Sequence, residues 1–370
     1  MKTTSGAVIF LALIASVFAQ DAKFFRLTGS VPSGFISVTA SGYVTWTNET
    51  VDATFTVQTA SSPIGDTNWV DYLQVPASSN STTVRLFNLQ PPQGMALIPA
   101  GTFIMGDDLD GSFGATPSRT VFVSEFYMDK HEVTKALWDQ VFQWATNNGY
   151  GFNSIGQGKA ANHPVHSVNW YDMLKWCNAR SEREGLSPAY YTGPDQSVVY
   201  RTGQSNVLNA WVKWDGNGYR LPTEAEWEKA ARGGLSGKRF PWGDSISWSK
   251  ANYYTSIGDV PYDENTTNGH HPSFSVAPLP YTNPVDHFPP NGYALHDMSG
   301  NVLERCWDYG GSSYDSLPTT DPLGLPSGQY RVVRGGSWDN GSSRLTSPFR
   351  DSDLPTAAYD LYGFRTARRE

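Results

Sequence analysis

Apolar and polar residues alternate along the first part of the chain at the two-residue period of β-strands. Ala53, Phe55 and Val57 are separated by threonines, so one face of that strand is predicted to be buried. Turn-forming stretches separate several such runs, and the stiff segment at 91–94 (PPQG) ends the pattern. We therefore predict a small all-β, sandwich-like module over residues 20–90.

Beyond this module, apolar residues recur three and four positions apart, which is the spacing of amphipathic helices. One helix is predicted over residues 134–144 and a second over residues 169–177, each beginning at a residue whose side chain can cap it. A third has the clearest start, because Thr223 and Glu226 fit a capping box and Gly233 follows as a stop. Long irregular connections between these helices indicate a mixed α and β domain.

The first 19 residues have the form of a secretory signal peptide, with Lys2, an apolar run at 7–18 and a small-residue cleavage site ending at Ala19. The apolar run has 12 residues, whereas a membrane-spanning helix needs about 20. We therefore expect no transmembrane segment and an extracytoplasmic location, either secreted or periplasmic.

Composition narrows the possible partners and crosslinks. The formal net charge of −8 argues against nucleic acid, because binding to phosphates requires a clustered basic surface. Only two cysteines are present, Cys177 and Cys306. In an oxidising compartment they could form one disulfide. The alternative is two separately buried thiols, since the sequence does not show whether their Cα atoms lie within bridging distance.

A series of ordered motifs fills the remainder of the chain. They occur at residues 98–106 (IPAGTFIMG), 163–170 (HPVHSVNW), 220–228 (RLPTEAEWE), 291–302 (NGYALHDMSGNV), 334–338 (RGGSW) and 363–365 (GFR). With these motifs, residues 95–370 resemble the sulfatase-modifying factor family, which includes formylglycine-generating enzymes. The resemblance implies an α+β, C-type-lectin-like fold with much irregular structure.

Formylglycine-generating enzymes use two cysteines that bind copper, and this chain differs at both positions. Counted without gaps from the RGGSW motif, the corresponding residues are Asn340 and Leu345, and no cysteine follows Cys306. An amide and an isobutyl group supply neither thiolate nucleophilicity nor soft-metal binding. We therefore expect no copper and no formylglycine generation by this route.

The leading hypothesis is a binding module that takes an extended peptide, a glycan or a partner protein in the cleft of its relatives. The predicted lining residues are Trp338, Asp339, Asn340, Ser342 and Arg344. One alternative is an oxidoreductase with a divergent metal site, although His163 and His166 flank Pro164, which argues against a regular helical ligand pair. Another is that the β module targets the chain to a surface and the large domain is a scaffold.

The resemblance also implies structural calcium, which prefers cages of oxygen ligands. Residues 297–304 match one calcium loop of the family. Its implied ligands are the carboxylates of Asp297 and Glu304 and the carbonyls of Gly300 and Val302. A second site would begin with Asn252 and the carbonyl of Tyr253. The alternative for Asp297 and Glu304 is a turn-capping residue and a buried ion pair.

Overall fold

The structure of the protein is a computed structural model. It describes residues 9–11, 24–29, 33–38, 42–48, 53–60, 69–77, 79–85, 91–111, 115–311 and 317–370. Most of the predicted signal peptide therefore lies outside the described residues. In the part of the chain that is described, no helix is both long and apolar enough to cross a membrane.

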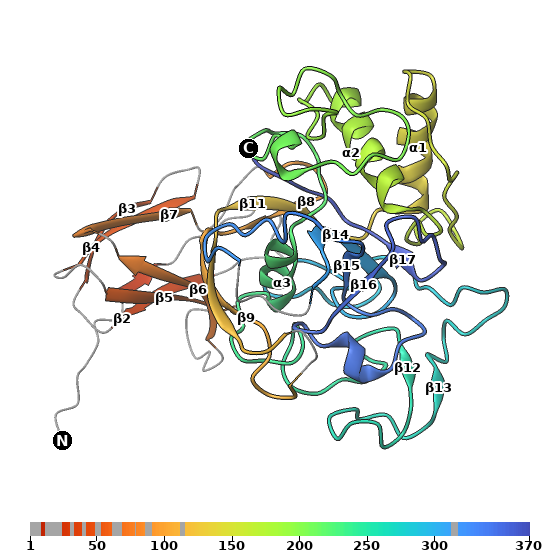
Figure 1. Ribbon diagram of the computed structural model, residues 1–370. Helices are drawn as coiled ribbons and strands as arrows, with labels where there is room; N and C mark the ends of the chain where they lie inside the picture. Colours follow the sequence, from red (N-terminus) through yellow and green to blue (C-terminus); the bar gives the residue numbers. More distant parts are fainter. Residues whose placement is uncertain are drawn as a thin grey trace.

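The N-terminal strands form two antiparallel sheets on one side of the molecule (Figure 1). The larger sheet has the order β1 (Ile9–Leu11), β2 (Phe24–Gly29), β5 (Ala53–Ala60), β6 (Val70–Ala77), β9 (Gly101–Met105) and β10 (Arg119–Val123). The smaller sheet has the order β3 (Ser33–Val38), β4 (Tyr43–Asn48) and β7 (Ser81–Arg85). Trp46 and Phe55 meet edge to face with their ring centroids 5.6 Å apart, so side chains of the two sheets pack against each other.

The hydrophobic core continues from these strands into the rest of the chain. Phe55 and Leu73 belong to the same buried cluster as Trp227 and Tyr293. The hydroxyl of Tyr293 also donates a hydrogen bond of 2.7 Å to the carbonyl of Tyr72. The predicted boundary at residues 91–94 falls between β7 and β8 along the chain, while the core spans both sides of it.

The large domain combines short sheets with three α-helices (Figure 1), which confirms the predicted α+β fold. One sheet has the order β18 (Ala367–Arg368), β11 (Phe126–Asp129) and β8 (Met95–Ile98). Another has the order β16 (Arg350–Asp353), β15 (Arg331–Arg334), β14 (Leu303–Tyr309) and β17 (Tyr362–Gly363). The hairpin of β12 (Tyr254–Thr255) and β13 (Gly269–His270) lies beyond them. The helices are α1 (Lys135–Thr146), α2 (Trp170–Arg183) and α3 (Glu224–Arg232).

All three predicted helix starts are confirmed by capping hydrogen bonds. The side chains of Thr134, Asn169 and Thr223 accept hydrogen bonds from the third amide of their helices. Glu226 completes the capping box of α3, and Gly233 ends that helix in the left-handed conformation with φ of 57°. Helix α3 packs between β9 and β10 on one side and β14 and β15 on the other, so it joins the two halves of the core.

The two cysteines are free, buried thiols and do not form the disulfide that the sequence permitted. Cys177 lies on α2 in a cluster with Trp138 and Trp176, whereas Cys306 lies on β14 in the cluster of Trp227. Burial raises the pKa of both thiols. The alternative of two separately buried cysteines is therefore the one that the structure contains.

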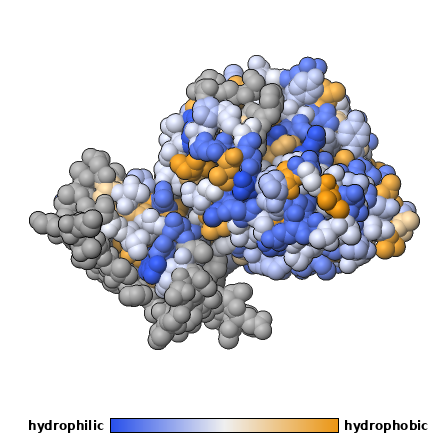
Figure 2. Space-filling view, turned by 90° about the horizontal axis from the view of Figure 1, so that it is seen from below, coloured by the Kyte–Doolittle hydropathy of each residue, from blue (hydrophilic) through white to orange (hydrophobic). Residues whose placement is uncertain are grey.

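Exposed apolar side chains are scattered over the surface. On the face seen in Figure 2, apolar residues form separate patches between polar ones. Ile155, Val276 and Val198 are the most exposed large apolar residues, at 73%, 63% and 60%. Isolated exposed apolar residues are usual on soluble domains and need no separate explanation.

Asp308, a buried acid on β14 that accepts a hydrogen bond from the first amide of α3, is expected to make the free energy of unfolding depend on pH. Burial, followed by repulsion from Glu224, raises the pKa of Asp308 from 3.8 to about 8. Because the folded state holds this acid protonated, the free energy of unfolding should fall as pH rises from about 4 to about 8. Urea unfolding across this range should show a loss on the order of a few kcal/mol.

The substitution Asp308→Asn should flatten this pH profile, because the amide is neutral and its oxygen can still accept the hydrogen bond from the Glu224 amide. Asp351→Asn, at a side chain that is 48% exposed, is the matched control and should leave the profile unchanged. Parallel profiles for wild type and Asp308→Asn would contradict the prediction.

Candidate functional site

Residues 337–341, which contain the predicted first cysteine position Asn340, are held by hydrogen bonds with two other loops. The amide of Tyr254 donates to the carbonyl of Asn340 at 3.0 Å, and the amide of Trp338 donates to the carbonyl of Asn301 at 2.8 Å. The hydroxyl of Ser337 donates to the side-chain oxygen of Asn340 at 2.9 Å. The predicted site is thus fixed between the β12–β13 hairpin and the loop proposed to bind calcium.

An aromatic cluster surrounds the predicted site residue Trp338. The ring of His270 lies 4.9 Å from Tyr254, 5.0 Å from Tyr281 and 5.5 Å from Trp338, measured between centroids. Its Nε2 lies 2.7 Å from the carboxylate of Asp339, which is 47% exposed. The half-buried rings of Tyr254, His270 and Tyr281 thus lie beside an accessible carboxylate and contact the buried Trp338 through His270 and Tyr281. We call these five residues the aromatic site.

The sequence prediction missed three members of the aromatic site as ligand-contacting residues: Tyr254, His270 and Tyr281. Tyr254 and His270 come from the short strands β12 and β13, and Tyr281 comes from a loop. No periodic pattern in such segments marks which side chains lie together. His270 and Trp338 are 68 positions apart in the chain. Only their spatial contact identifies them, and the sequence contains no local signal for it.

Three of the predicted lining residues are not part of the aromatic site: Asn340, Ser342 and Arg344. The side-chain oxygen of Asn340 accepts the hydrogen bond from Ser337. The guanidinium of Arg344 lies 3.6 Å from the carboxylate of Asp351 and over the ring of Phe349. Ser342 is fully buried at the start of a 3₁₀ turn, Ser342–Leu345. The turn thus directs Ser342 into the core and Arg344, whose side chain is 53% exposed, toward β16. A ligand-lining role for these two residues stays a prediction.

Leu345, which the motif count places at the second predicted cysteine position, is a core residue. It is fully buried in a cluster with Phe240, Ile246 and Tyr253. Adding a Cβ to Gly336, whose φ is 73°, would bring it 2.8 Å from a methyl carbon of Leu345. Packing as close as this shows that the isobutyl group fills the space on this side of the site.

Three buried polar atoms around the aromatic site have no hydrogen-bond partner within the described structure. They are the indole Nε1 of Trp338, the side-chain Oδ1 of Asn252 and the hydroxyl of Ser342. Buried polar atoms in native proteins are normally paired, so an unpaired group indicates a water, an ion or a ligand as its partner. These three atoms are therefore candidates for contact with water or an ion, although other buried polar atoms without partners occur elsewhere in the described structure.

The residues of the first predicted calcium loop are already engaged with protein groups. Both oxygens of Glu304 accept hydrogen bonds of 2.7 Å from Arg365, and one also accepts from the indole of Trp227. The carboxylate of Asp297 accepts hydrogen bonds from Asn283 and from the amide of Asp286. Burial raises the pKa of Asp297 to about 6. Glu304 therefore forms the buried ion pair that was the alternative to calcium.

The second predicted calcium position fits a hard cation better. The unpaired Oδ1 of Asn252 is an amide oxygen of the kind that calcium accepts. Gly300 of the first loop packs directly on this residue, because a Cβ there would lie 2.4 Å from the carbonyl oxygen of Asn252. The carbonyl of Tyr253 accepts a hydrogen bond from Trp248. Among the residues that the structure describes, no group of three or more histidine, cysteine or acidic side chains is arranged for a metal, and calcium remains a prediction.

Comparison with known proteins identifies relatives for most of the chain. The sulfatase-modifying factor enzyme 1-like domain matches residues 81–370. The formylglycine-generating enzyme of Streptomyces coelicolor is 34% identical over 297 residues, which cover 74% of this chain and 89% of that protein. The enzyme of Bos taurus is 33% identical over 299 residues, covering 75% of each chain. The chaperone protein LppX of Paenibacillus barcinonensis is 33% identical over 263 residues, covering 65% of this chain and 81% of LppX.

Solved structures show the same fold. Treponema denticola variable protein 1 is similar with a TM-score of 0.54 and 28% identity, over 75% of this chain and 95% of that one. PvdO from Pseudomonas aeruginosa has a TM-score of 0.54 at 23% identity, over 75% of this chain and 94% of PvdO. At that identity, the likeness to PvdO shows the fold alone.

Proposed function

Because the chain belongs to the sulfatase-modifying factor enzyme 1-like family, we propose that it is an exported binding module that has kept the family fold and lost thiol-based oxidation. The observation that carries this proposal is the replacement of the cysteine pair by Asn340 and Leu345. The two cysteines elsewhere in the chain are buried, and burial raises the pKa of both. A buried thiol with a raised pKa is a poor nucleophile and a poor metal ligand.

The ligand that the aromatic site fits best is an extended peptide. Aromatic rings offer large contact areas at a low cost in side-chain entropy, and they dominate binding energy at protein interfaces. The carboxylate of Asp339, whose side chain is 47% exposed, can accept from a peptide amide or a basic side chain. LppX, a relative named as a chaperone, supports a protein-binding role for this domain.

Two measurements on the purified mature protein test the loss of oxidation. With a cysteine-containing peptide, copper and a reductant, we expect no aldehyde product by mass spectrometry, whereas a formylglycine-generating relative should form it. Metal analysis should find neither stoichiometric copper nor iron. Aldehyde product, or stoichiometric redox metal with thiol-dependent oxygen consumption, would establish the oxidoreductase alternative instead.

A third experiment tests the aromatic site. Peptides are first selected from a random library for binding to the mature protein. They should bind the Tyr281→Ala variant at least about tenfold more weakly than the wild type, because loss of an interface aromatic commonly costs over 1.4 kcal/mol. Tyr359→Ala, at a side chain that is 57% exposed and distant in sequence, is the matched control. Equal binding by both variants would show that peptides bind elsewhere. Selective binding on a glycan array, without any peptide binding, would show that the ligand is a glycan and not a peptide.

A further inference from the structure

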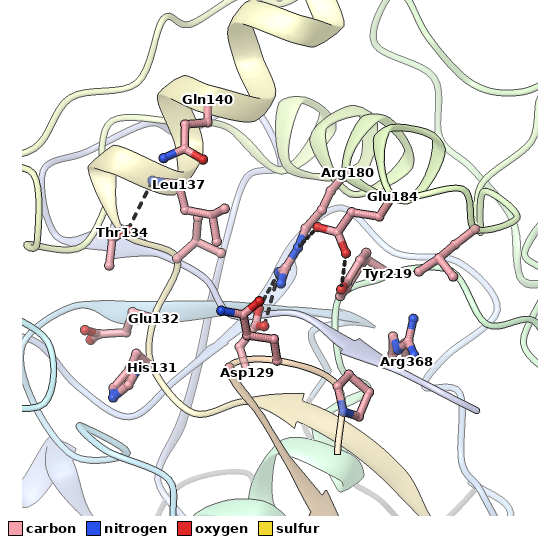
Figure 3. A pocket seen from close by; sticks show the side chains of 15 residues that line it. Asp129, His131, Glu132, Thr134, Leu137, Gln140, Arg180, Glu184, Tyr219 and Arg368 are labelled. Atoms are coloured by element: carbon pink, nitrogen blue, oxygen red, sulfur yellow. Dashed lines mark hydrogen bonds and ion pairs between the residues drawn. The ribbon is translucent and has the colours of Figure 1, made fainter. Parts of the chain in front are cut away.

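A cavity of about 550 Å³ lies between the α1–α2 pair and the sheet of β8, β11 and β18. Its walls come from the turn before β8, the segment after β11, both helices and the end of β18 (Figure 3). None of the residues of the aromatic site lines it. The cavity therefore offers room for a ligand independently of the proposed peptide site.

Most charged groups in the cavity wall are already paired. Arg180 donates to both oxygens of Asp129 at 2.9 and 3.1 Å and approaches Glu184 at 3.4 Å. Its guanidinium also stacks 3.8 Å from the ring centroid of Tyr219. Glu132 accepts hydrogen bonds from the side chain of Asn301 and from a backbone amide. Each of these charged groups is therefore already engaged with a protein partner.

Arg368 is the exception. Within the described parts of the chain it forms no ion pair, and its Nε is buried without a hydrogen-bond partner. Its guanidinium donates a long hydrogen bond of 3.4 Å to the carbonyl of Asn217 and lies 5.5 Å from the ring centroid of Tyr219. Figure 3 shows Arg368 at one side of the cavity next to Tyr219, with His131 at the opposite side. A half-buried guanidinium without a carboxylate partner favours an anionic ligand, because arginine pairs with carboxylates in a bidentate fork.

The remaining lining residues indicate which other chemical groups the ligand contains. Val133, Leu137 and Leu186 contribute apolar surface to the cavity. Burial, with a smaller effect from the adjacent His296, whose ring centroid lies 4.8 Å away, lowers the pKa of His131 to about 4. Its ring is therefore neutral near pH 7. The cavity thus combines one positive charge outside an ion pair with an apolar patch at Leu137 and Leu186, within a lining that is otherwise mainly polar.

We propose that this cavity is a binding site for small amphipathic organic carboxylates. The carboxylate pairs with Arg368, and the hydrocarbon part lies against Leu137 and its apolar neighbours. The site is independent of the aromatic site, so the two proposals can fail separately.

Hexanoate is a suitable probe, titrated into the mature protein by ligand-observed NMR or calorimetry. We expect saturable binding at one site, with acetate binding at least tenfold more weakly because it lacks the hydrocarbon chain. Hexylammonium, which has the same chain and the opposite charge, should not compete. Arg368→Gln should weaken hexanoate binding roughly tenfold or more, since charge-assisted hydrogen bonds are lost.

Arg369→Gln is the matched control, because the neighbouring Arg369 lies 3.6 Å from Asp321 and lines a different cavity. It should bind hexanoate like the wild type. Arg368→Lys keeps the charge and should retain part of the affinity, which separates loss of charge from loss of folding. Absence of saturable hexanoate binding, equal binding of hexylammonium, or equal effects of the two glutamine variants would overturn the proposal.

Discussion

Replacing Arg365 by methionine is expected to lower the free energy of unfolding by about 3–5 kcal/mol, because it leaves a buried carboxylate without its partner. Arg365 and Glu304 are 0% and 1% exposed, and two hydrogen bonds of 2.7 Å join them. The guanidinium also donates to the carbonyls of Asp129, Lys130 and His296. One side chain thus ties β14 to the end of β11 and to the loop before the predicted calcium residues.

Urea unfolding followed by tryptophan fluorescence measures this effect. The double variant Arg365→Met with Glu304→Gln should recover part of the loss, because the unpaired charge is then removed as well. Lys135→Met is the control. Its partner Asp139 is 51% exposed, and pairs of this kind contribute about 0.3–0.5 kcal/mol. Similar losses for Arg365→Met and Lys135→Met would show that the buried pair has no special role.

Trp138→Ala is expected to destabilise the domain by about 3–5 kcal/mol, the range for large aromatic residues removed from a core. Trp138 is fully buried and stacks in parallel with Trp176 of α2 at a centroid distance of 5.8 Å. Its indole donates a hydrogen bond of 2.8 Å to the carbonyl of Ile155. Gly156 is needed beside it, since a Cβ there would come 2.4 Å from the indole nitrogen.

The same unfolding measurement applies to this variant. Trp144→Ala, on the same helix at a half-buried position, removes the same side chain and should cost clearly less. Trp138→Phe keeps part of the ring packing and loses the hydrogen bond to Ile155, so it should lie between wild type and Trp138→Ala. An equal loss for Trp138→Ala and Trp144→Ala would contradict the burial argument.

The sequence predicted those parts of the fold that depend on interactions between residues close together in the chain. Thr223 and Glu226 cap α3 as the sequence predicted, because the capping box involves residues only three positions apart. The strand alternation at Ala53, Phe55 and Val57 is present in β5, where all three side chains are buried. The ordered motifs predicted the family, and the family match confirms it.

The site could be predicted only in part. The motif count located Asn340 and Leu345, but it could not show that Leu345 is a core residue while Asp339 stays exposed. Tertiary packing decides this, because Leu345 ends a 3₁₀ turn and packs in a cluster with Phe240 and Tyr253, whereas Asp339 precedes that turn. Arg368 carried no signal in the sequence, since an unpaired arginine is recognised only when the positions of all nearby carboxylates are known.

The sequence by itself determined which family the chain belongs to, where its helices begin, and that no cysteine follows Cys306. These properties depend on residue identity and on spacings of a few positions. The tertiary structure decided that Cys177 and Cys306 stay apart, that Glu304 pairs with Arg365, and that Tyr281 and His270 meet Trp338. Such contacts join residues that are distant in the chain, and their geometry follows from how the whole core packs.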